Sequence, residues 1–421
     1  MEEYFKLLEK YNLWGKKSFD FGFKRESYTQ KIIDFTGTRL VKVLVGQRRS
    51  GKSYILRQVA AELVSQGVNP VNILIINREF TDFDFLKTYK ELDELIKTYL
   101  KKLKPQGRIY IFIDEIQNIE QWERVVNSYS QDYSDSYELF ITGSNSKMLS
   151  GELATLLSGR YVNIEIFPLS YSEYLGITKK EPGRISYSEY MSSGGLPELF
   201  LLTNPELKRN YVSAVKDTVL LRDIIQRNNI REPKLLEELF AFLVNNASNL
   251  ISIPNIVKYF KSKGRKIGYD IVSTYIGYIE DCFLIHKCDR YDIKGKETLS
   301  GNAKYYVNDL CYKNYLYPGY GYGYGYLVEN LVYLHLKRAG YSVYVGSLRG
   351  KEVDFVAKKA DRIVYLQCSY MLTDKATVER EYSALEAIDD NFEKVVVSLD
   401  DVVLPLRGGI KHVRAWELFS E

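Results

Sequence analysis

The sequence predicts an α/β fold with a doubly wound, mainly parallel sheet in its N-terminal part and further, smaller domains after it. The first observation is length, because 421 residues exceed what one hydrophobic core usually serves, and about two to four domains are expected. The second is a series of short apolar runs that alternate in large part with helical stretches. These runs lie near residues 40–45, 71–77, 109–113, 138–142 and 162–166. The third is a glycine-rich turn directly after the first run, which is followed by a helical pattern.

The first apolar run, LVKVLV, is rich in β-branched residues, and the later segment SYILRQVAAELVSQG repeats apolar positions at helical spacing. The turn GQRRSGKS fits the pattern G-x-x-x-x-G-K-[ST] at each fixed position. Backbone N–H groups of such a turn, together with the N-terminus of the next helix, favour a bound phosphate. The sequence therefore predicts a nucleotide site formed by Gly46, Gln47, Arg48, Arg49, Ser50, Gly51, Lys52 and Ser53.

The cofactors expected at this loop are ATP and Mg²⁺. Lys52 would place a point charge on the β- and γ-phosphates, and the Ser53 hydroxyl could ligate Mg²⁺. Another apolar strand, IYIFI, ends in Asp114 and Glu115. Asp114 would hold Mg²⁺, usually through water, and Glu115 would orient or deprotonate the attacking water. The alternative is that the two acids only cap the next helix.

Polar residues also follow the strand YELFITG, where Ser144 and Asn145 come next. Ligands bind at the carboxyl ends of the strands in a parallel sheet, so we expect both residues beside the γ-phosphate. Arg160 follows a helix-like run. It could be an arginine finger or another γ-phosphate sensor, or it could form only a salt bridge. Ser144, Asn145 and Arg160 join Glu115 as candidate catalytic residues.

Several motifs in combination resemble the prokaryotic AAA+ ATPases that join an AAA_14 core to a DUF4143 region. They are GQRRSGKS, FIDEIQN, TGSNSKMLSGELATLLSGRY, IFPLSYSEYL, YMSSGGLPE, DIIQRNNIRE, KYYVNDLC, EVDFVA, YLQCSY and ERE. The similarity covers nearly the whole chain from about Arg25 onward. It implies a P-loop NTPase fold of the AAA+ (ASCE) class, ATP binding and ATPase activity. Ser144 and Asn145 then stand where AAA+ enzymes carry their first sensor residue.

We expect four parts along the chain: a P-loop AAA+ core at 1–165, a helical lid or connector at 166–231, a winged helix at 232–317 and a nuclease-like domain at 318–421. The winged helix is predicted from the helical patterns LLEELFAFLVNNA, ISIPNIVKYFKSKG and YDIVSTYIGYIEDC, with two short strands around Gly295. The basic segment KYFKSKGRK could contact nucleic-acid phosphates, or it could be only a solvated face. The stretch PGYGYGYGYL is expected to be a flexible linker or gate, with an aromatic stacking strip for nucleic acid as the alternative.

The final part resembles a small α/β domain of the PD-(D/E)xK nuclease type. Its acids are Glu329 on a helix and Glu352 and Asp354 on a hairpin, and Gln367 lies on the next strand. Nuclease chemistry needs acids that hold Mg²⁺ and a lysine two positions after the second acid or glutamine. Ser369 stands where that lysine is expected. Lys375 could reach in instead, but cleavage is not the function that the sequence favours.

Composition limits the partners. Lys and Arg exceed Asp and Glu by only 58 to 54, so any basic surface must be local. No apolar run approaches the roughly 20 residues of a membrane span, and the N-terminus lacks the apolar region of a signal peptide. The four cysteines show no C-x-x-C spacing, which suggests a reduced compartment. We therefore expect a cytoplasmic protein without a membrane partner.

Three functional classes remain. The favoured class is an ATPase whose winged helix and nuclease-like domain contact nucleic acid or a partner. The second is a nucleotide-controlled switch or assembly module that binds protein. The third is an ATP-dependent nuclease. AAA+ folds commonly form homo-oligomers, but no feature of the sequence counts subunits.

Overall fold

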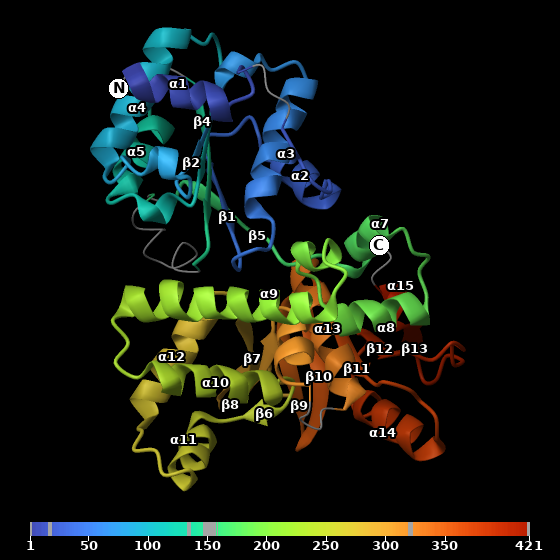
Figure 1. Ribbon diagram of the computed structural model, residues 1–421. Helices are drawn as coiled ribbons and strands as arrows, with labels where there is room; N and C mark the ends of the chain where they lie inside the picture. The colour runs from blue at the N-terminus through green and yellow to red at the C-terminus, as the bar shows by residue number, and fades with distance from the viewer. Residues whose placement is uncertain are drawn as a thin grey trace. The chain divides into compact units, whose positions relative to one another are not determined.

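The computed structural model describes residues 2–15, 19–132, 136–145, 157, 159–318 and 323–418. The chain forms two compact units, Met1–Ile166 and Phe167–Glu421 (Figure 1). The first unit ends at Ile166, one residue after the end expected at residue 165. No helix in the described ranges is both long and apolar enough to cross a bilayer.

The sheet of the first unit confirms the predicted fold class. Its described strands are β1 (Val41–Val45), β2 (Ile73–Asn77), β3 (Ile109–Asp114), β4 (Tyr137–Gly143) and β5 (Tyr161–Glu165). All pair in parallel, in the order β2-β3-β4-β1-β5. β1, β3 and β4 are buried at every position, as expected of central parallel strands covered on both faces. The five apolar runs of the sequence thus became the five strands.

Helices cover both faces of this sheet (Figure 1). The described ones are α1 (Glu2–Tyr11), α2 (Glu26–Asp34), α3 (Lys52–Ser65), α4 (Tyr89–Leu103) and α5 (Trp122–Ser130). α2 packs on α3, and α4 packs on α5 and α1. α4 begins with a capping box, in which the Thr88 side chain accepts from a backbone N–H of the first turn and Glu91 reaches back to the Thr88 N–H.

An N-terminal asparagine protects the edge strand β2. Asn12 is fully buried, and its side chain accepts a hydrogen bond from the Ile75 N–H at 2.5 Å. The same side chain donates to the Ile75 carbonyl at 2.9 Å. It therefore pairs with the strand much as a neighbouring strand would, which leaves fewer backbone groups of β2 open to another chain.

The second unit begins with helices and contains a π-helical segment. Its helices are α7 (Tyr171–Thr178), α8 (Arg184–Ser193), α9 (Pro205–Thr218), the π-helix Val219–Gln226, α10 (Pro233–Asn245), α11 (Ile253–Ser262), α12 (Tyr269–Asp281), α13 (Tyr324–Arg338), α14 (Lys375–Glu386) and α15 (Ala415–Leu418). α7 starts with a capping box of Ser170 and Glu173. α11 starts at a serine cap, since the Ser252 hydroxyl accepts from the Asn255 N–H at 3.3 Å.

An eight-stranded mixed sheet runs through the described part of the second unit in the order β13-β12-β11-β10-β9-β7-β8-β6. Its strands are β6 (Leu250–Ile251), β7 (Ile285–Asp292), β8 (Glu297–Val307), β9 (Ser342–Leu348), β10 (Lys351–Lys359), β11 (Arg362–Cys368), β12 (Glu393–Ser398) and β13 (Ile410–Arg414). The hairpin β7–β8 is the pair expected around Gly295. β7 also pairs in parallel with β9, so the hairpin continues directly into the sheet of the C-terminal strands.

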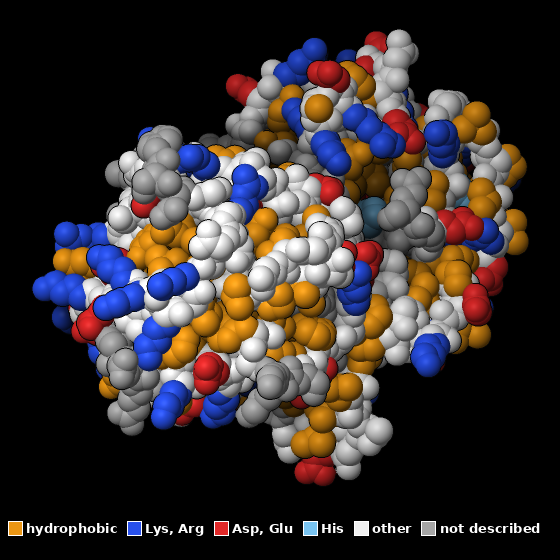
Figure 2. All heavy atoms as spheres, turned by 90° about the horizontal axis from the view of Figure 1, so that it is seen from above, with side chains coloured by type: hydrophobic (Ala, Val, Ile, Leu, Met, Phe, Trp, Pro, Cys, Tyr) orange, Lys and Arg blue, Asp and Glu red, His pale blue; other side chains and the backbone are white. Residues whose placement is uncertain are grey.

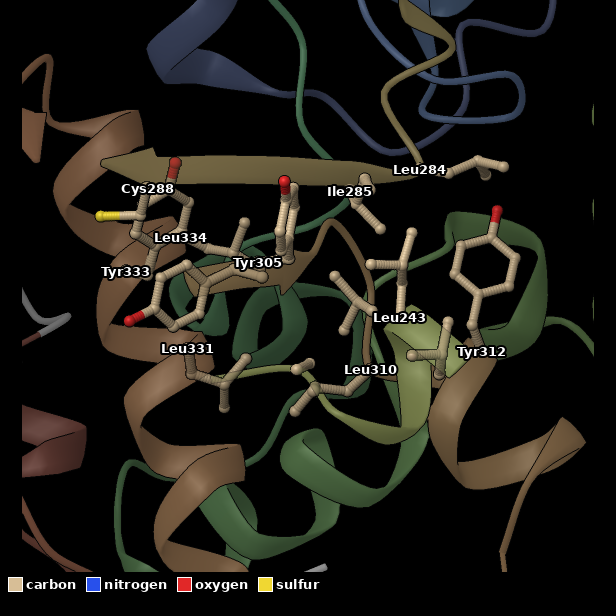
Figure 3. Packing of buried hydrophobic residues seen from close by; sticks show 14 of the residues in the cluster. Leu243, Leu284, Ile285, Cys288, Tyr305, Leu310, Tyr312, Leu331, Tyr333 and Leu334 are labelled. Atoms are coloured by element: carbon tan, nitrogen blue, oxygen red, sulfur yellow. The ribbon is translucent and has the colours of Figure 1, made fainter. Parts of the chain in front are cut away.

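The core of the second unit crosses the later boundaries expected from the sequence. Figure 3 shows side chains of α13, such as Leu331 and Leu334, packed with Ile285 of β7 and Tyr305 of β8. Residues 231/232 and 317/318 therefore lie within one compact unit. The sequence could not reveal this, because the β7–β9 pairing joins segments that are far apart in the chain.

The glycine–tyrosine stretch PGYGYGYGYL differs in part from the expected linker. α13 begins at Tyr324, inside this stretch, so its last residues form the first turn of a helix. Residues 319–322 lie outside the described residues. Tyr324, the first residue of this helix, stacks on Tyr370, with ring centroids 4.9 Å apart.

Candidate nucleotide site

The loop between β1 and α3 needs glycine at two positions. Gly46 has φ 149° and Gly51 has φ 98°, a backbone region that favours glycine. A Cβ on Gly46 would also lie 2.2 Å from the carbonyl oxygen of Ile166. Arg25, which is buried, supports the loop from outside by donating to the Ser50 carbonyl at 2.8 Å. The loop is therefore built into the fold and does not form only around a ligand.

Lys52 is the first residue of α3, and its side chain turns back over the loop. Its Nζ donates to the carbonyls of Gly46 at 2.8 Å and Gln47 at 3.0 Å. Ser50, also in the loop, is fully buried, and its hydroxyl has no hydrogen-bond partner among the described residues. A buried hydroxyl without a partner costs free energy, so a phosphate oxygen here would supply a missing contact. This loop fits the triphosphate that its sequence implies.

Asp114 ends β3 and is held by side chains from three neighbouring elements. The Thr142 hydroxyl of β4 donates to Asp114 Oδ1 at 2.5 Å, and Asn77 of β2 donates to Oδ2 at 2.9 Å. The Ser53 hydroxyl of α3 also bonds this carboxylate. A cavity of about 100 Å³ is lined in part by Ser53, Asn77 and Asp114. Oxygen atoms of this kind suit Mg²⁺, which is bound by few carboxylates together with water and phosphate oxygens.

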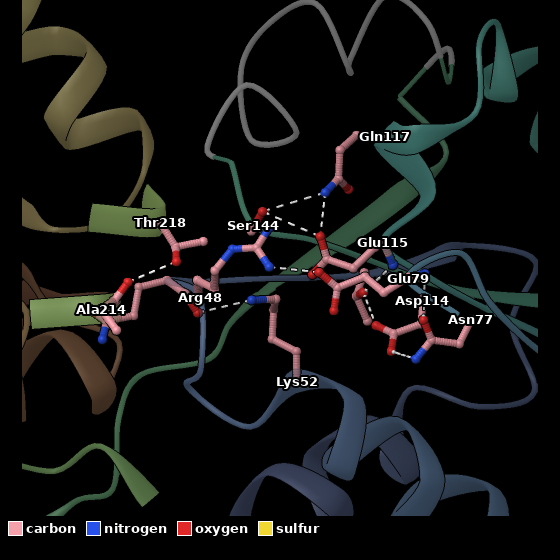
Figure 4. Close-up of polar contacts among 12 residues, drawn as sticks. Arg48, Lys52, Asn77, Glu79, Asp114, Glu115, Gln117, Ser144, Ala214 and Thr218 are labelled. Atoms are coloured by element: carbon pink, nitrogen blue, oxygen red, sulfur yellow. Dashed lines mark hydrogen bonds and ion pairs between the residues drawn. The ribbon is translucent and has the colours of Figure 1, made fainter. Parts of the chain in front are cut away.

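Glu115 follows Asp114 in the left-handed backbone region, with φ 53°. Its N–H donates to the Thr142 hydroxyl at 2.9 Å, which fixes this unusual conformation. Its carboxylate accepts from Gln117 at 2.5 Å and from the Ser144 hydroxyl at 3.4 Å (Figure 4). The Glu115 carboxylate therefore points to the end of β4, where Ser144 lies. Glu115 caps no helix with its side chain, although it precedes a short 3₁₀ turn.

Burial controls the ionisation of these groups. It lowers the pKa of the Lys52 ammonium, against the effect of the nearby Glu115 and Asp114 carboxylates. It raises the pKa of Asp114, which the hydrogen bonds from Thr142 and Ser53 partly oppose. Burial also raises the pKa of Glu115, and the charge of Lys52 opposes that rise. A buried carboxylate with a raised pKa accepts a proton more readily, as a general base requires.

Arg48 of the loop forms an ion pair with Glu79, with 2.6 Å between Nη1 and Oε1 (Figure 4). Glu79 follows the carboxyl end of β2, and its N–H donates to the Asn77 side chain at 2.8 Å. Arg48 is thus held by an acid from the strand beside Asp114. The neighbouring Arg49 has φ 68°, so the loop turns sharply between these two arginines.

The structure separates Arg160 from this site within its own chain. Arg160 is exposed and precedes β5, and its carbonyl accepts from the Val41 N–H at the start of β1. Both strands run parallel, so Arg160 lies at the amino edge of the sheet and the loop lies at the carboxyl edge. The five residues of β5 put about 16 Å between the two edges. A γ-phosphate sensor in its own site is therefore wrong for Arg160, whereas a finger for a second copy stays a prediction.

The other predicted residues lie at the carboxyl edge. Ser144 and Asn145 directly follow β4, and both are buried. The segment 146–156, from which a helix-like run was expected, lies outside the described residues. The sequence did not predict that Thr142, Asn77, Gln117 or Glu79 belong to this site. The rule that ligands lie at carboxyl ends of strands would have reached Asn77 and Thr142, because each stands at or next to such an end.

The strand order, the glycine-containing loop ahead of α3 and the acid pair after β3 define a P-loop domain of the AAA type. An AAA domain model (AAA_14) matches residues 38–175, and a domain of unknown function (DUF8612) matches residues 184–318. The second match differs from the expected DUF4143 region, which is not shown.

Relatives match nearly the whole chain. An uncharacterized protein of Haemophilus influenzae is 37% identical over 378 residues, which cover 89% of this chain and 92% of that one. Uncharacterized protein MJ1544 of Methanocaldococcus jannaschii is 31% identical over 390 residues, which cover 87% of this chain and 81% of that one. The chain belongs to the family of these proteins. Among solved structures, it is similar to the Walker-type ATPase PABY2304 of Pyrococcus abyssi, at 16% identity and a TM-score of 0.44, over 70% of this chain and 96% of that one.

Proposed function

We propose that this protein binds and hydrolyses ATP with Mg²⁺, and that its second unit couples turnover to contact with nucleic acid. The observation that carries the first part is the meeting of Lys52, Asp114 and Glu115 at the carboxyl edge of one parallel sheet. Three elements supply the charge, the metal ligand and the base that phosphoryl transfer to water requires.

Each residue has a distinct role in this proposal. Lys52 releases the carbonyls of Gly46 and Gln47 and binds the β- and γ-phosphates. Ser53 and Asp114 hold Mg²⁺, which offsets phosphate charge when bound. Glu115 accepts a proton from the attacking water, and Ser144 holds the Glu115 carboxylate toward it. Gly46 to Ser53 supply backbone N–H groups for the phosphates.

The contact with nucleic acid is proposed from the end of α11. Lys258, Lys261 and Lys266 are exposed there, while Arg265 pairs with Glu238. The order of α10, β6, α11, α12 and the β7–β8 hairpin is that of a winged helix, in which the last helix enters the major groove. On the face drawn in Figure 2, Lys and Arg are interspersed with Asp and Glu. Because the whole-molecule charge is only +4, the contact is proposed from the local lysine cluster.

The first test is steady-state ATP hydrolysis by the full chain, with Glu115→Gln as the blank. Lys52→Ala should weaken ATP binding, whereas Glu115→Gln should keep ATP and lose turnover. Equal hydrolysis by Glu115→Gln and the parent would refute the base, and unchanged ATP affinity of Lys52→Ala would refute the loop assignment.

The second test adds single- and double-stranded DNA and RNA at low and moderate salt. Stimulation should fade with salt, and the triple change Lys258→Glu, Lys261→Glu and Lys266→Glu should remove it. The matched control carries the same charge change at the exposed lysines Lys87, Lys90 and Lys101 of the first unit. Turnover that no nucleic acid changes would refute this part and favour the protein-binding switch or assembly module.

A further inference from the structure

A buried lysine lies among the acids of the second unit that resemble a nuclease site. Lys304 Nζ is 2.8 Å from Glu329 Oε1, 2.7 Å from Glu352 Oε1 and 3.7 Å from Asp354 Oδ1. The Lys304 side chain is 3% exposed and the Glu329 side chain 6%, so this is not a surface ion pair. One buried ammonium therefore contacts three carboxylates, of which Glu329 and Asp354 are mostly buried and Glu352 is 43% exposed.

The lysine comes from a different part of the chain than the acids. Lys304 lies on β8, paired with Cys288 of β7 on one side and Leu250 of β6 on the other. Glu329 lies on α13, and Glu352 and Asp354 lie on β10. The backbone of β8 at Lys304 is thus paired on both edges, which fixes where its side chain starts.

Two oxygen atoms of the cluster accept hydrogen bonds from further donors. The Tyr306 hydroxyl donates to Glu329 Oε1 at 2.7 Å, and the Cys368 N–H donates to Asp354 Oδ2 at 2.8 Å. Gln367 Oε1 accepts from the Asp354 N–H at 2.6 Å. The Gln367 amide in turn donates to the Glu381 carboxylate at 3.1 Å, which fixes its orientation. Glu329 Oε1 and Asp354 Oδ2 therefore each face a hydrogen-bond donor in addition to Lys304.

The charge state agrees with this geometry. Burial alone would lower the pKa of Lys304, but Glu329, Asp354 and Glu352 outweigh it, so that the pKa lies well above its usual value. Lys304 remains an ammonium at neutral pH. Removing one partner of such a buried cluster leaves uncompensated charge, which is strongly destabilising.

We infer that Lys304 is a tethered cation that takes the place of a divalent metal in this cluster. The unit is therefore held together at this point without metal, and the cluster is not a nuclease centre. The residues that the resemblance assigns to Mg²⁺ do not fit a metal in this structure. Among the described residues no group of three or more His, Cys, Asp or Glu is arranged to hold one.

This inference corrects the lysine suggested by the sequence. Lys375 begins α14 and is exposed, and it does not line the cavity beside the acids. The Ser369 hydroxyl donates to the Met371 carbonyl at 3.2 Å. Lys304 therefore supplies the positive charge for which Lys375 was considered. Lys304 contacts the carboxylate oxygens directly. A nuclease would need these same oxygens to bind Mg²⁺.

The test is Mn²⁺ binding by the full chain, followed by electron paramagnetic resonance without nucleotide. Asp114→Asn is present in every sample to remove the metal ligand of the first unit. Solvent reaches the cluster, because Lys304, Glu329, Glu352 and Asp354 line a cavity of about 1030 Å³. We expect no Mn²⁺ bound at this cluster with Lys304 present, and one bound Mn²⁺ in Lys304→Met, which adding Asp354→Asn removes.

Mn²⁺ bound with Lys304 in place, and lost on Asp354→Asn, would overturn the inference. A folded Lys304→Met protein that binds no Mn²⁺ would overturn it as well. If Lys304→Met does not fold, the inference is tested on the protein that retains Lys304, by its Mn²⁺ binding and by its unfolding temperature. That temperature should not change between excess Mg²⁺ and a chelator, and a rise with Mg²⁺ that needs Asp354 would count against a tethered cation.

Discussion

Replacing Thr142 by valine removes one hydroxyl from β4, next to the two acids at the end of β3. That hydroxyl donates to Asp114 Oδ1 at 2.5 Å and accepts from the Glu115 N–H at 2.9 Å, and Thr142 is fully buried. Valine has the same shape, so no cavity forms. The change leaves Asp114 with one donor fewer and the Glu115 N–H without its partner.

The expected loss of stability follows from the two hydrogen bonds that the valine variant lacks. A buried polar group left without a partner costs about 1–3 kcal/mol, so the loss of two bonds should lower the free energy of unfolding of the first unit by about 2–6 kcal/mol. Turnover should fall as well, because the Glu115 N–H bond fixes a left-handed residue at φ 53°. A base displaced by 1 Å can lose on the order of 100-fold in rate.

The assay is urea unfolding and ATP hydrolysis measured in parallel for Thr142→Val and Thr142→Ser. Serine keeps the hydroxyl and loses only a methyl group, so its free energy of unfolding should fall by about 1 kcal/mol and most turnover should remain. If valine and serine variants match in both stability and turnover, the hydroxyl does not organise the two acids. The reasoning from this pair of hydrogen bonds would then be refuted.

Three further predictions concern other parts of the chain. Asn12→Ala should lower the free energy of unfolding by about 1–3 kcal/mol, because the Ile75 backbone loses both hydrogen bonds to Asn12. Urea unfolding measures this change. An unchanged unfolding midpoint would mean that water replaces Asn12 without cost. Burial raises the pKa of Glu280 from 4.5 to about 7, so the free energy of unfolding should fall by up to about 3 kcal/mol as pH rises between these values and then level off. Glu280→Gln keeps the acceptor for the Lys287 N–H and should lose this fall, and an unaltered pH profile would contradict it. If Arg160 serves a second copy, mixing Arg160→Ala with Lys52→Ala protein should change turnover relative to either alone, and simple averaging of the two rates would argue against that role.

Local patterns carried the prediction of the nucleotide site. Gly46, Lys52 and the Asp114–Glu115 pair each stand in a short motif whose chemistry depends on neighbours in the sequence, so the motif and the site coincide. Thr142 and Asn77 were not named, although they contact Asp114, because threonine and asparagine after a strand are common in turns as well. Their role depends on strand order, which places β2 and β4 on either side of β3.

The place of Arg160 at the amino edge of the sheet could have been predicted from the sequence. A strand was expected at 162–166, and its parallel direction puts the residue before it at the amino edge of the sheet. The role of Arg160 was predicted from the helix-like run that precedes it in the sequence. Its position in the fold depends on the direction of the strand that follows it. Lys304 is the opposite case, since no local pattern links a lysine on β8 to acids on α13 and β10. Only the pairing of β7 with β9 brings these segments together.

The two acid sites of this chain differ in the kind of donor that holds their carboxylates. Around Asp114 the donors are hydroxyl and amide groups of Thr142, Ser53 and Asn77, which carry no charge and can turn to bind other oxygens. A divalent cation can therefore be added there without displacing a charge. Around Asp354 and Glu329 the donors include the charged ammonium of Lys304, which a metal would have to displace from a buried position. If the proposals hold, carboxylates favour a metal in the first unit and not in the second, because only in the second does a buried positive charge already contact them.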